Sequence, residues 1–206
     1  MTKRKMSHIT LILLVVVAGI FAWNLRAFAG YESAEYTVVE TDGEFEIRDY
    51  PDLKLAATEM KRDSKGRDGS FMRLFGYISG GNEAKQKIEM TTPVFMEAGE
   101  EETKGQMGFV IPKQVASDGP PEPVSEAVKI RERKGGRFAV IRFSGIMNTE
   151  TASEAEAKLR AWIEQKGLVA EQAAETAGYD PPFTPGPLRR NEVLIRLKSE
   201  APADKS

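Results

Sequence analysis

The residues best suited to contact a flat apolar ligand lie at positions 87–96, which read KIEMTTPVFM. Met90 and Met96 stand on either side of Pro93 in this stretch. A methionine thioether adapts to irregular apolar gaps, whereas proline offers no N–H to a β-ladder and belongs at an edge, at a bulge or beside a pocket. The stretch is therefore either an edge strand or one wall of a binding site. The two methionines share strand parity, so in a regular strand they face the same side.

Histidine and cysteine set strict limits on the chemistry. The sequence has no cysteine, and its single histidine, His8, lies among the first 29 residues. Beyond them, Ser-His-Asp and Cys-His catalysis are excluded, as are zinc sites of the usual His/Cys kind. The remaining carboxylates, lysines and tyrosines show no paired arrangement for acid–base work, so we expect a protein that is not an enzyme. A haem iron could have only methionine, tyrosine or no protein ligand. Tyr77 is a candidate ligand, with a structural role as the alternative.

The first 29 residues have the three parts of a secretory signal peptide. They are the basic residues 3–5, an uncharged run of 15 residues from Ile9 to Trp23, and Ala27-Phe28-Ala29. The run is shorter than the roughly 20 apolar residues of a spanning helix, so we predict cleavage after Ala29. The alternative is an uncleaved anchor, and membrane contact is then expected through this segment only. In either case we expect the folded part to be periplasmic, secreted or anchored outside the cytoplasm.

Composition indicates one globular domain. The chain has 206 residues, 41% hydrophobic and 29% charged, which is enough for a core of its own. We assign the domain to residues 30–199 and expect residues 200–206 to form a disordered tail. Removing residues 1–29 removes four basic groups and no acidic group, so the net charge falls from −2 to −6. No basic stripe attracts nucleic acid, and we expect a monomer.

Hydrophobic periodicity predicts the elements of the first half. Residues 36–41 and 45–50 alternate as strands around Asp42-Gly43, which is a strong hairpin signal. Residues 53–60 form a further strand after a turn at Pro51-Asp52. A helix follows, because Phe71, Leu74, Phe75 and Ile78 recur at i, i+3, i+4 and i+7. Gly80-Gly81-Asn82 ends this helix.

The second half repeats the order of hairpin, helix and strand. Residues 128–133 and 138–143 form the hairpin around a turn at Lys134–Gly136. Thr151 and Glu154 match a capping box that opens a helix. Residues 192–198 form the last strand, and residues 113–127 and 178–191 are connections. A duplication explains this order, since one such unit cannot bury its apolar face alone. Two facing units predict an α+β fold, with two helices packed on an antiparallel sheet or open barrel.

Three stretches then carry a resemblance to a known family. FMRLFGYISGGN, KIEMTTPV and AGYDPPFTPGPLRRNEV are similar, in this order, to the SOUL haem-binding protein family, and the resemblance covers residues 31–198. It implies a distorted eight-stranded barrel of two duplicated halves with two packed helices, related to GyrI-like effector-binding domains. It also implies haem or another tetrapyrrole, bound in a shallow apolar depression near the first helix for buffering or transfer.

The resemblance assigns residues to that depression. Its apolar wall would be formed by Phe71, Leu74, Phe75, Met90 and Met96. Basic side chains that hold haem propionates in other members would be replaced by Arg73, Lys85, Lys87, Arg189 and Arg190. Core packing is the alternative for the helix residues and methionines, and pairing with nearby Glu or Asp is the alternative for Arg189 and Arg190.

Two other functions stay open. A GyrI-like pocket would bind, or bind and hydrolyse, other amphiphilic small molecules through a buried glutamate, for which Glu46, Glu59 and Glu89 are the candidates. A raised pKa on a buried glutamate would favour that reading. The third reading is an envelope module that binds another protein.

Overall fold

The computed structural model describes residues 31–60, 68–98 and 105–198. The chain divides into two compact units, residues 1–32 and 33–206, and the fold is that of the second unit. The predicted signal peptide and the predicted tail at 200–206 lie outside the described residues. In the part of the chain that is described, no helix is long and apolar enough to cross a membrane.

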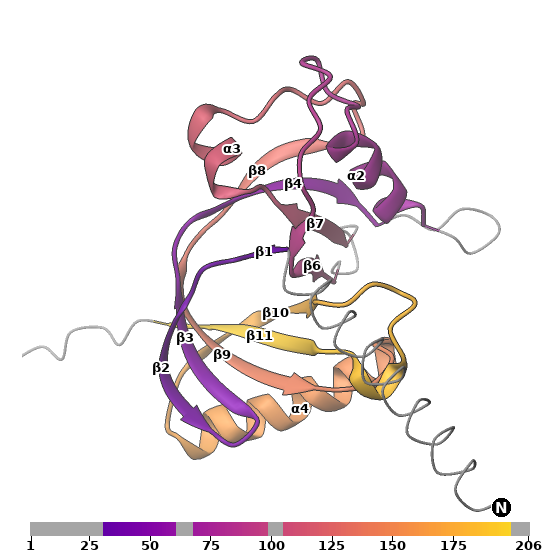
Figure 1. Cartoon of the computed structure of the whole chain (residues 1–206). Helices are drawn as coiled ribbons and strands as arrows, with labels where there is room; N and C mark the ends of the chain where they lie inside the picture. Colours follow the sequence, from indigo (N-terminus) through magenta and orange to yellow (C-terminus); the bar gives the residue numbers. More distant parts are fainter. Residues whose placement is uncertain (1–30, 61–67, 99–104, 199–206) are drawn as a thin grey trace, which may run out of the picture. The chain divides into compact units, whose positions relative to one another are not determined.

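An antiparallel sheet of nine strands is the framework of this unit (Figure 1). The strand order is β2-β3-β9-β11-β10-β6-β7-β4-β8. The strands are β2 (Thr37–Asp42), β3 (Phe45–Tyr50), β4 (Leu53–Glu59), β6 (Val94–Glu97), β7 (Gln106–Val110), β8 (Lys129–Arg133), β9 (Gly136–Phe143), β10 (Ala170–Gly178) and β11 (Asn191–Leu197). Outside this sheet lie β1 (Glu32–Ser33) and β5 (Thr91–Thr92), and Pro93 separates β5 from β6. The predicted α+β class is confirmed, but the sheet has nine strands and is not closed into a barrel.

The predicted hairpin between residues 128–133 and 138–143 is wrong, because these two strands pair with other strands. The hairpin at Asp42-Gly43 is confirmed by the pairing of β2 with β3. However, β3 pairs with β9 and β4 pairs with β8, in one continuous register. Residues 45–59 and 129–143 are therefore two long antiparallel arms, visible as the curved ribbons in Figure 1. The predicted turns instead lie opposite each other in a bend that both arms share. The arms approach closely there, since a Cβ on Gly135 would lie only 2.4 Å from the carbonyl oxygen of Tyr50.

The helices follow the predicted order with shifted ends. The first, α2 (Ser70–Ile78), ends before Gly80, whose φ is 109°. The long helix α4 (Thr149–Gln165) is capped by Asn148, whose side chain accepts from the Thr151 N–H at 2.9 Å. The predicted Thr151–Glu154 box is therefore wrong by three residues. Three elements were not predicted: α3 (Lys113–Asp118), η1 (Gly186–Leu188) and strand β10.

Successive side chains of β11 point to opposite faces of the sheet and so belong to different hydrophobic clusters. Val193 and Ile195 pack with Leu159 and Trp162 of α4 on one face of the sheet. Leu194, two positions from Glu192, points to the opposite face and packs with other apolar side chains there. A third cluster lies under α2. Glu192 therefore points to the same face as Leu194, which is the face of the sheet opposite α4.

Candidate functional site

The predicted apolar stripe of α2 is split between core and surface. Leu74 and Ile78 are buried under the helix, whereas Phe71 and Phe75 remain 39% and 44% exposed. The two pairs are about 60° apart around the axis, because three residues advance a helix by almost one turn. The exposed rings are nearly parallel, with centroids 6.2 Å apart, and Phe71 also packs edge-on against Phe109 of β7 at 5.2 Å. Core packing therefore explains Leu74 but not the two phenylalanines.

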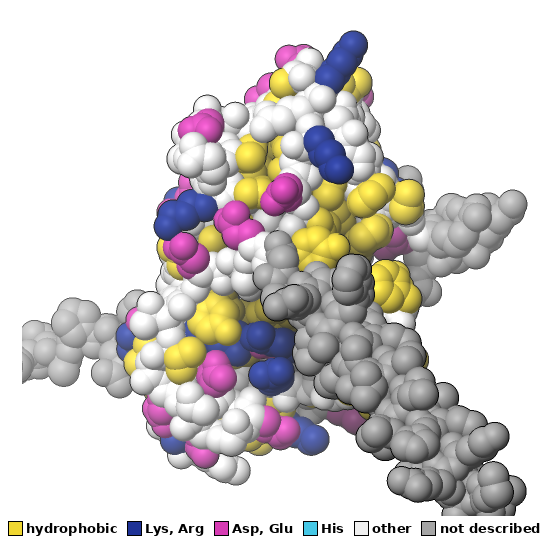
Figure 2. Space-filling model, in the orientation of Figure 1, with side chains coloured by type: hydrophobic (Ala, Val, Ile, Leu, Met, Phe, Trp, Pro, Cys, Tyr) yellow, Lys and Arg dark blue, Asp and Glu magenta, His cyan; other side chains and the backbone are white. Residues whose placement is uncertain are grey.

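Strands β6 and β7 continue this apolar surface. Val94 faces Phe109, and Met96 faces Met107, so the four side chains share one side of the sheet. Val94 and Met90 pack against the cluster under α2. Figure 2 shows hydrophobic side chains gathered beside α2. The structure thus brings the two predicted methionines to the side of the sheet that carries α2, and we call Phe71, Phe75, Val94 and Met96 the apolar face.

The predicted arginines lie elsewhere and are already bonded. Arg73 donates from Nε to Thr58 Oγ1 at 3.0 Å, from Nη1 to the Asp68 carbonyl at 2.8 Å and from Nη2 to the Glu59 carbonyl at 2.6 Å. Arg189 donates to the carbonyls of Thr184 and Pro182. Arg73 thus ties α2 to β4, and Arg189 holds its own loop.

Lys85 and Lys87 have a different environment from the arginines. Both are exposed in the segment that follows α2. They are therefore the predicted basic side chains with access to solvent, where a ligand carboxylate can reach them.

Tyr77 lies in the core beneath α2. It is 2% exposed, and its hydroxyl donates to the Pro121 carbonyl at 2.9 Å. Burial also raises the pKa of its phenol to about 12, which opposes the phenolate form that binds iron. This placement supports the structural alternative for Tyr77.

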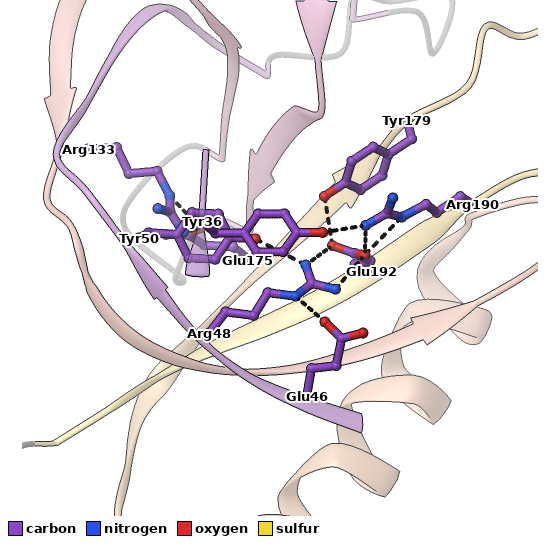
Figure 3. Close-up of polar contacts among 9 residues, drawn as sticks. All are labelled: Tyr36, Glu46, Arg48, Tyr50, Arg133, Glu175, Tyr179, Arg190 and Glu192. Carbon is purple, nitrogen blue, oxygen red and sulfur yellow. Dashed lines mark hydrogen bonds and ion pairs between the residues drawn. The ribbon is translucent and has the colours of Figure 1, made fainter. Parts of the chain in front are cut away.

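A buried charged network lies on the other side of the sheet (Figure 3). Its centre is Glu192, which is fully buried. Arg48 donates to both carboxylate oxygens, at 2.8 and 3.0 Å. Arg190 donates from Nη2 at 2.6 Å, and the Tyr179 hydroxyl donates at 2.9 Å. The pairing alternative therefore holds for Arg190.

Aromatic rings enclose the two guanidinium groups. Arg48 lies 4.2 Å from the ring centre of Tyr36, and Arg190 lies 3.9 Å from that of Tyr179. Arg48 also donates from Nε to Glu46 at 2.6 Å, and from Nη1 to the Tyr50 hydroxyl at 3.1 Å. The positive charges of Arg48 and Arg190 are thus balanced by Glu46 and Glu192 inside the network, and the guanidinium groups pack against aromatic rings.

Electrostatics fix the ionisation of Glu192. Burial raises the pKa of its carboxyl, but the hydrogen bonds and positive charges of Arg48 and Arg190 outweigh burial, so the pKa lies below its ordinary value. Burial has the largest effect on Tyr50 and raises its pKa to about 12. Glu192 is therefore a carboxylate whose charge is already compensated.

The three glutamates expected for an effector pocket do not supply a buried carboxyl. Glu59 and Glu89 are exposed, and the side chain of Glu46 is 25% exposed. Among the described residues the buried glutamate is Glu192, which the sequence analysis did not identify. The available signal was an acidic residue at the start of the apolar run EVLIRL. Its lowered pKa is the opposite of what the effector reading requires.

The apolar face has side chains that suit a tetrapyrrole. Aromatic rings offer stacking surfaces, and thioethers offer soft contacts. Within the described ranges, no group of His, Cys, Asp and Glu side chains could hold a metal ion. A tetrapyrrole bound here would rely on apolar contact, with methionine as the ligand type that could reach its iron.

Known proteins resemble this chain in sequence. The family model described as SOUL heme-binding protein matches residues 31–196. Heme-binding protein 2 of Mus musculus is 33% identical over 167 residues, covering 77% of this chain and 80% of the mouse protein. Heme-binding protein 1 of Xenopus tropicalis is 30% identical over 177 residues, covering 81% and 92%.

Solved structures share the fold at much lower identity. A hydrolase from Listeria innocua superposes with a TM-score of 0.55 at 13% identity, covering 78% of this chain and 94% of that protein. Identity at this level shows a common fold alone, since one fold carries many functions.

Proposed function

This chain belongs to the SOUL haem-binding protein family, and we propose that it binds haem or a related tetrapyrrole on the apolar face without a His or Cys ligand. The observation that carries the proposal is the exposed, stacked pair of Phe71 and Phe75, on the side of the sheet that also carries the half-buried Met96. Adjacent, partly exposed rings that continue into an apolar strand surface mark a place where another molecule binds. A flat apolar ligand is such a molecule.

The binding we propose is reversible and not enzymatic. Apolar contact supplies most of the affinity, and exposed Lys85 and Lys87 are the basic groups for ligand carboxylates. Without a strong iron ligand the ligand exchanges readily, which suits buffering or transfer. If the leader at residues 1–29 directs the chain as its sequence predicts, this exchange takes place outside the cytoplasm.

The test is a titration of purified residues 30–206 with hemin, followed by its Soret band, and with iron-free protoporphyrin, followed by fluorescence quenching. We expect both ligands to saturate the protein. Phe75→Ala should weaken both by about tenfold, because an aromatic contact contributes about 0.5–1.5 kcal/mol beyond its buried area.

A matched control is Val169→Ala, which shortens another exposed apolar side chain, 61% exposed, ahead of β10. It should leave both affinities unchanged. If neither tetrapyrrole saturates the wild-type protein at low micromolar concentration, the proposal fails, and a protein partner in the envelope becomes the better reading.

A further inference from the structure

The apolar face extends across β6 to strand β10. Val94 pairs with Phe109 of β7 on one side and with Gly178 of β10 on the other. Directly opposite residues share one side of a sheet, so Gly178 faces the same side as Phe109 and, through it, Phe71. Phe109 and Gly178 are two strand spacings apart, about 10 Å. Phe109, Val94 and Gly178 form a row that connects the rings of α2 to the end of β10.

Gly178 leaves a vacant side-chain position in this row. Its φ does not lie in the left-handed region, so the backbone does not require glycine. A Cβ built there would meet Met147 Cε at 3.5 Å and Met96 Cε at 4.0 Å, both ordinary contact distances. A Cβ would therefore fit at this last residue of β10, and a residue without one lets a ligand approach the backbone closely.

The two methionines come from different parts of the fold. Met96 lies on β6, and Met147 immediately precedes Asn148, the cap of α4. Met107 is the third methionine near this row, but its sulfur already accepts from Ser70 Oγ at 3.4 Å. Met96 and Met147 are half-buried and flank the vacant position.

We propose that the bound tetrapyrrole covers Gly178 and that the thioethers of Met96 and Met147 are the protein groups that meet its iron. This inference rests on the proposed function and adds the ligand's position and its iron contacts. Thioether sulfur is an established ligand of haem iron.

Two sets of variants test the inference on residues 30–206. Gly178→Val fills the vacant position and should weaken hemin and protoporphyrin alike, by about tenfold or more. Its melting temperature should not fall, because valine suits a strand. Ala173→Val, at an exposed position of the same strand, is the control and should leave both affinities unchanged.

The double variant Met96→Leu/Met147→Leu keeps the apolar volume and removes both sulfurs. It should abolish the near-infrared absorption band of methionine-ligated ferric haem and weaken hemin more than it weakens protoporphyrin. Each single variant then shows which sulfur binds the iron.

The outcomes separate this inference from the proposed function. If the wild-type protein binds both tetrapyrroles and none of these variants changes affinity or spectrum, the inference is wrong and the proposed function stands. If the wild-type protein binds neither, both fail. A wild-type hemin complex without the methionine band overturns the thioether contacts, and unchanged affinity in Gly178→Val overturns the position.

Discussion

Glu192 is the residue whose loss should damage the fold most directly. It is fully buried and compensates Arg48, which is 1% exposed, together with Arg190. Glu192→Gln keeps the shape but leaves the guanidinium charge of Arg48 without its main partner. We expect the free energy of unfolding to fall by about 3 kcal/mol, as for other broken buried ion pairs. Urea denaturation measures this loss.

The control for that change is Glu46→Gln. Glu46 also accepts from Arg48, but its side chain is 25% exposed, so water can replace the contact and the loss should stay below about 1 kcal/mol. Equal losses in the two variants would mean that Glu192 is not the centre of the network.

The same carboxylate should make stability depend on acidity. The pKa of Glu192 is lower in the folded protein than its ordinary value of 4.5. A lowered pKa contributes stability that is fully present above the unfolded value and is lost as pH falls through the folded value. The free energy of unfolding should therefore fall as pH drops below about 4.5. Urea denaturation between pH 7 and pH 3 tests this, and Glu192→Gln should show a shallower fall. An identical slope in both proteins would contradict the assignment.

Residue types in the site were predictable from the sequence, but their partners were not. The spacing of Phe71, Leu74 and Phe75 predicts a helix, and the structure has one. Which of the three faces water depends on how α2 meets β7, a contact between distant parts of the chain. The sequence left Arg190 with two roles, holding a ligand carboxylate or pairing with a nearby acid, because Glu192, two residues away, reads as the start of an ordinary strand. Its burial follows from the central place of β11 in the sheet.

At the scale of elements, the arms show where local signals mislead. Pro51-Asp52 and Lys134–Gly136 both read as turns, yet they lie opposite each other in one bend. A turn signal states that the backbone departs from a regular strand, and only the pairing partner decides whether the chain reverses. That partner is about 80 residues away in sequence. The register that joins the arms was therefore beyond local reasoning, whereas the tight hairpin at Asp42-Gly43 was not.

The close approach inside this bend should make Gly135 intolerant of any side chain. A Cβ there would lie 2.4 Å from the Tyr50 carbonyl oxygen and 2.5 Å from the Pro51 carbonyl carbon. Both are backbone atoms, so relief requires moving an arm. Gly135→Ala should lower the free energy of unfolding by about 2–3 kcal/mol, measured by chemical denaturation.

Gly43→Ala is the comparison at an open turn. Gly43 has a φ of 63° and no atom within 4 Å of a built Cβ. It should cost about 1–2 kcal/mol through backbone strain alone. A smaller loss at Gly135 than at Gly43 would show that the arms are not held together at this point.

For the whole molecule, the open sheet raises the question of how its edges avoid other copies. The terminal strands of the nine are β2 and β8. All residues of β2 are exposed, including Val38 and Val39 at 45% and 48%. An exposed apolar edge is a template for pairing. Two devices protect β2: a register shift between Val38 and Glu40, and the charge of Glu40, which Lys166 holds at 2.7 Å.

Because these devices protect the edge, we expect residues 30–206 to sediment as a monomer. Glu40→Val should reverse this result, since it removes the charge and creates three consecutive valines on an exposed edge strand. Sedimentation velocity over a range of concentrations should then show dimers or larger species. Glu164→Val removes the same charge from an exposed position of α4 and should stay monomeric, because a helix surface offers no unpaired backbone. Association of the wild-type protein itself would show that the register shift and the charge of Glu40 do not prevent pairing, and that β2 is an interface between copies.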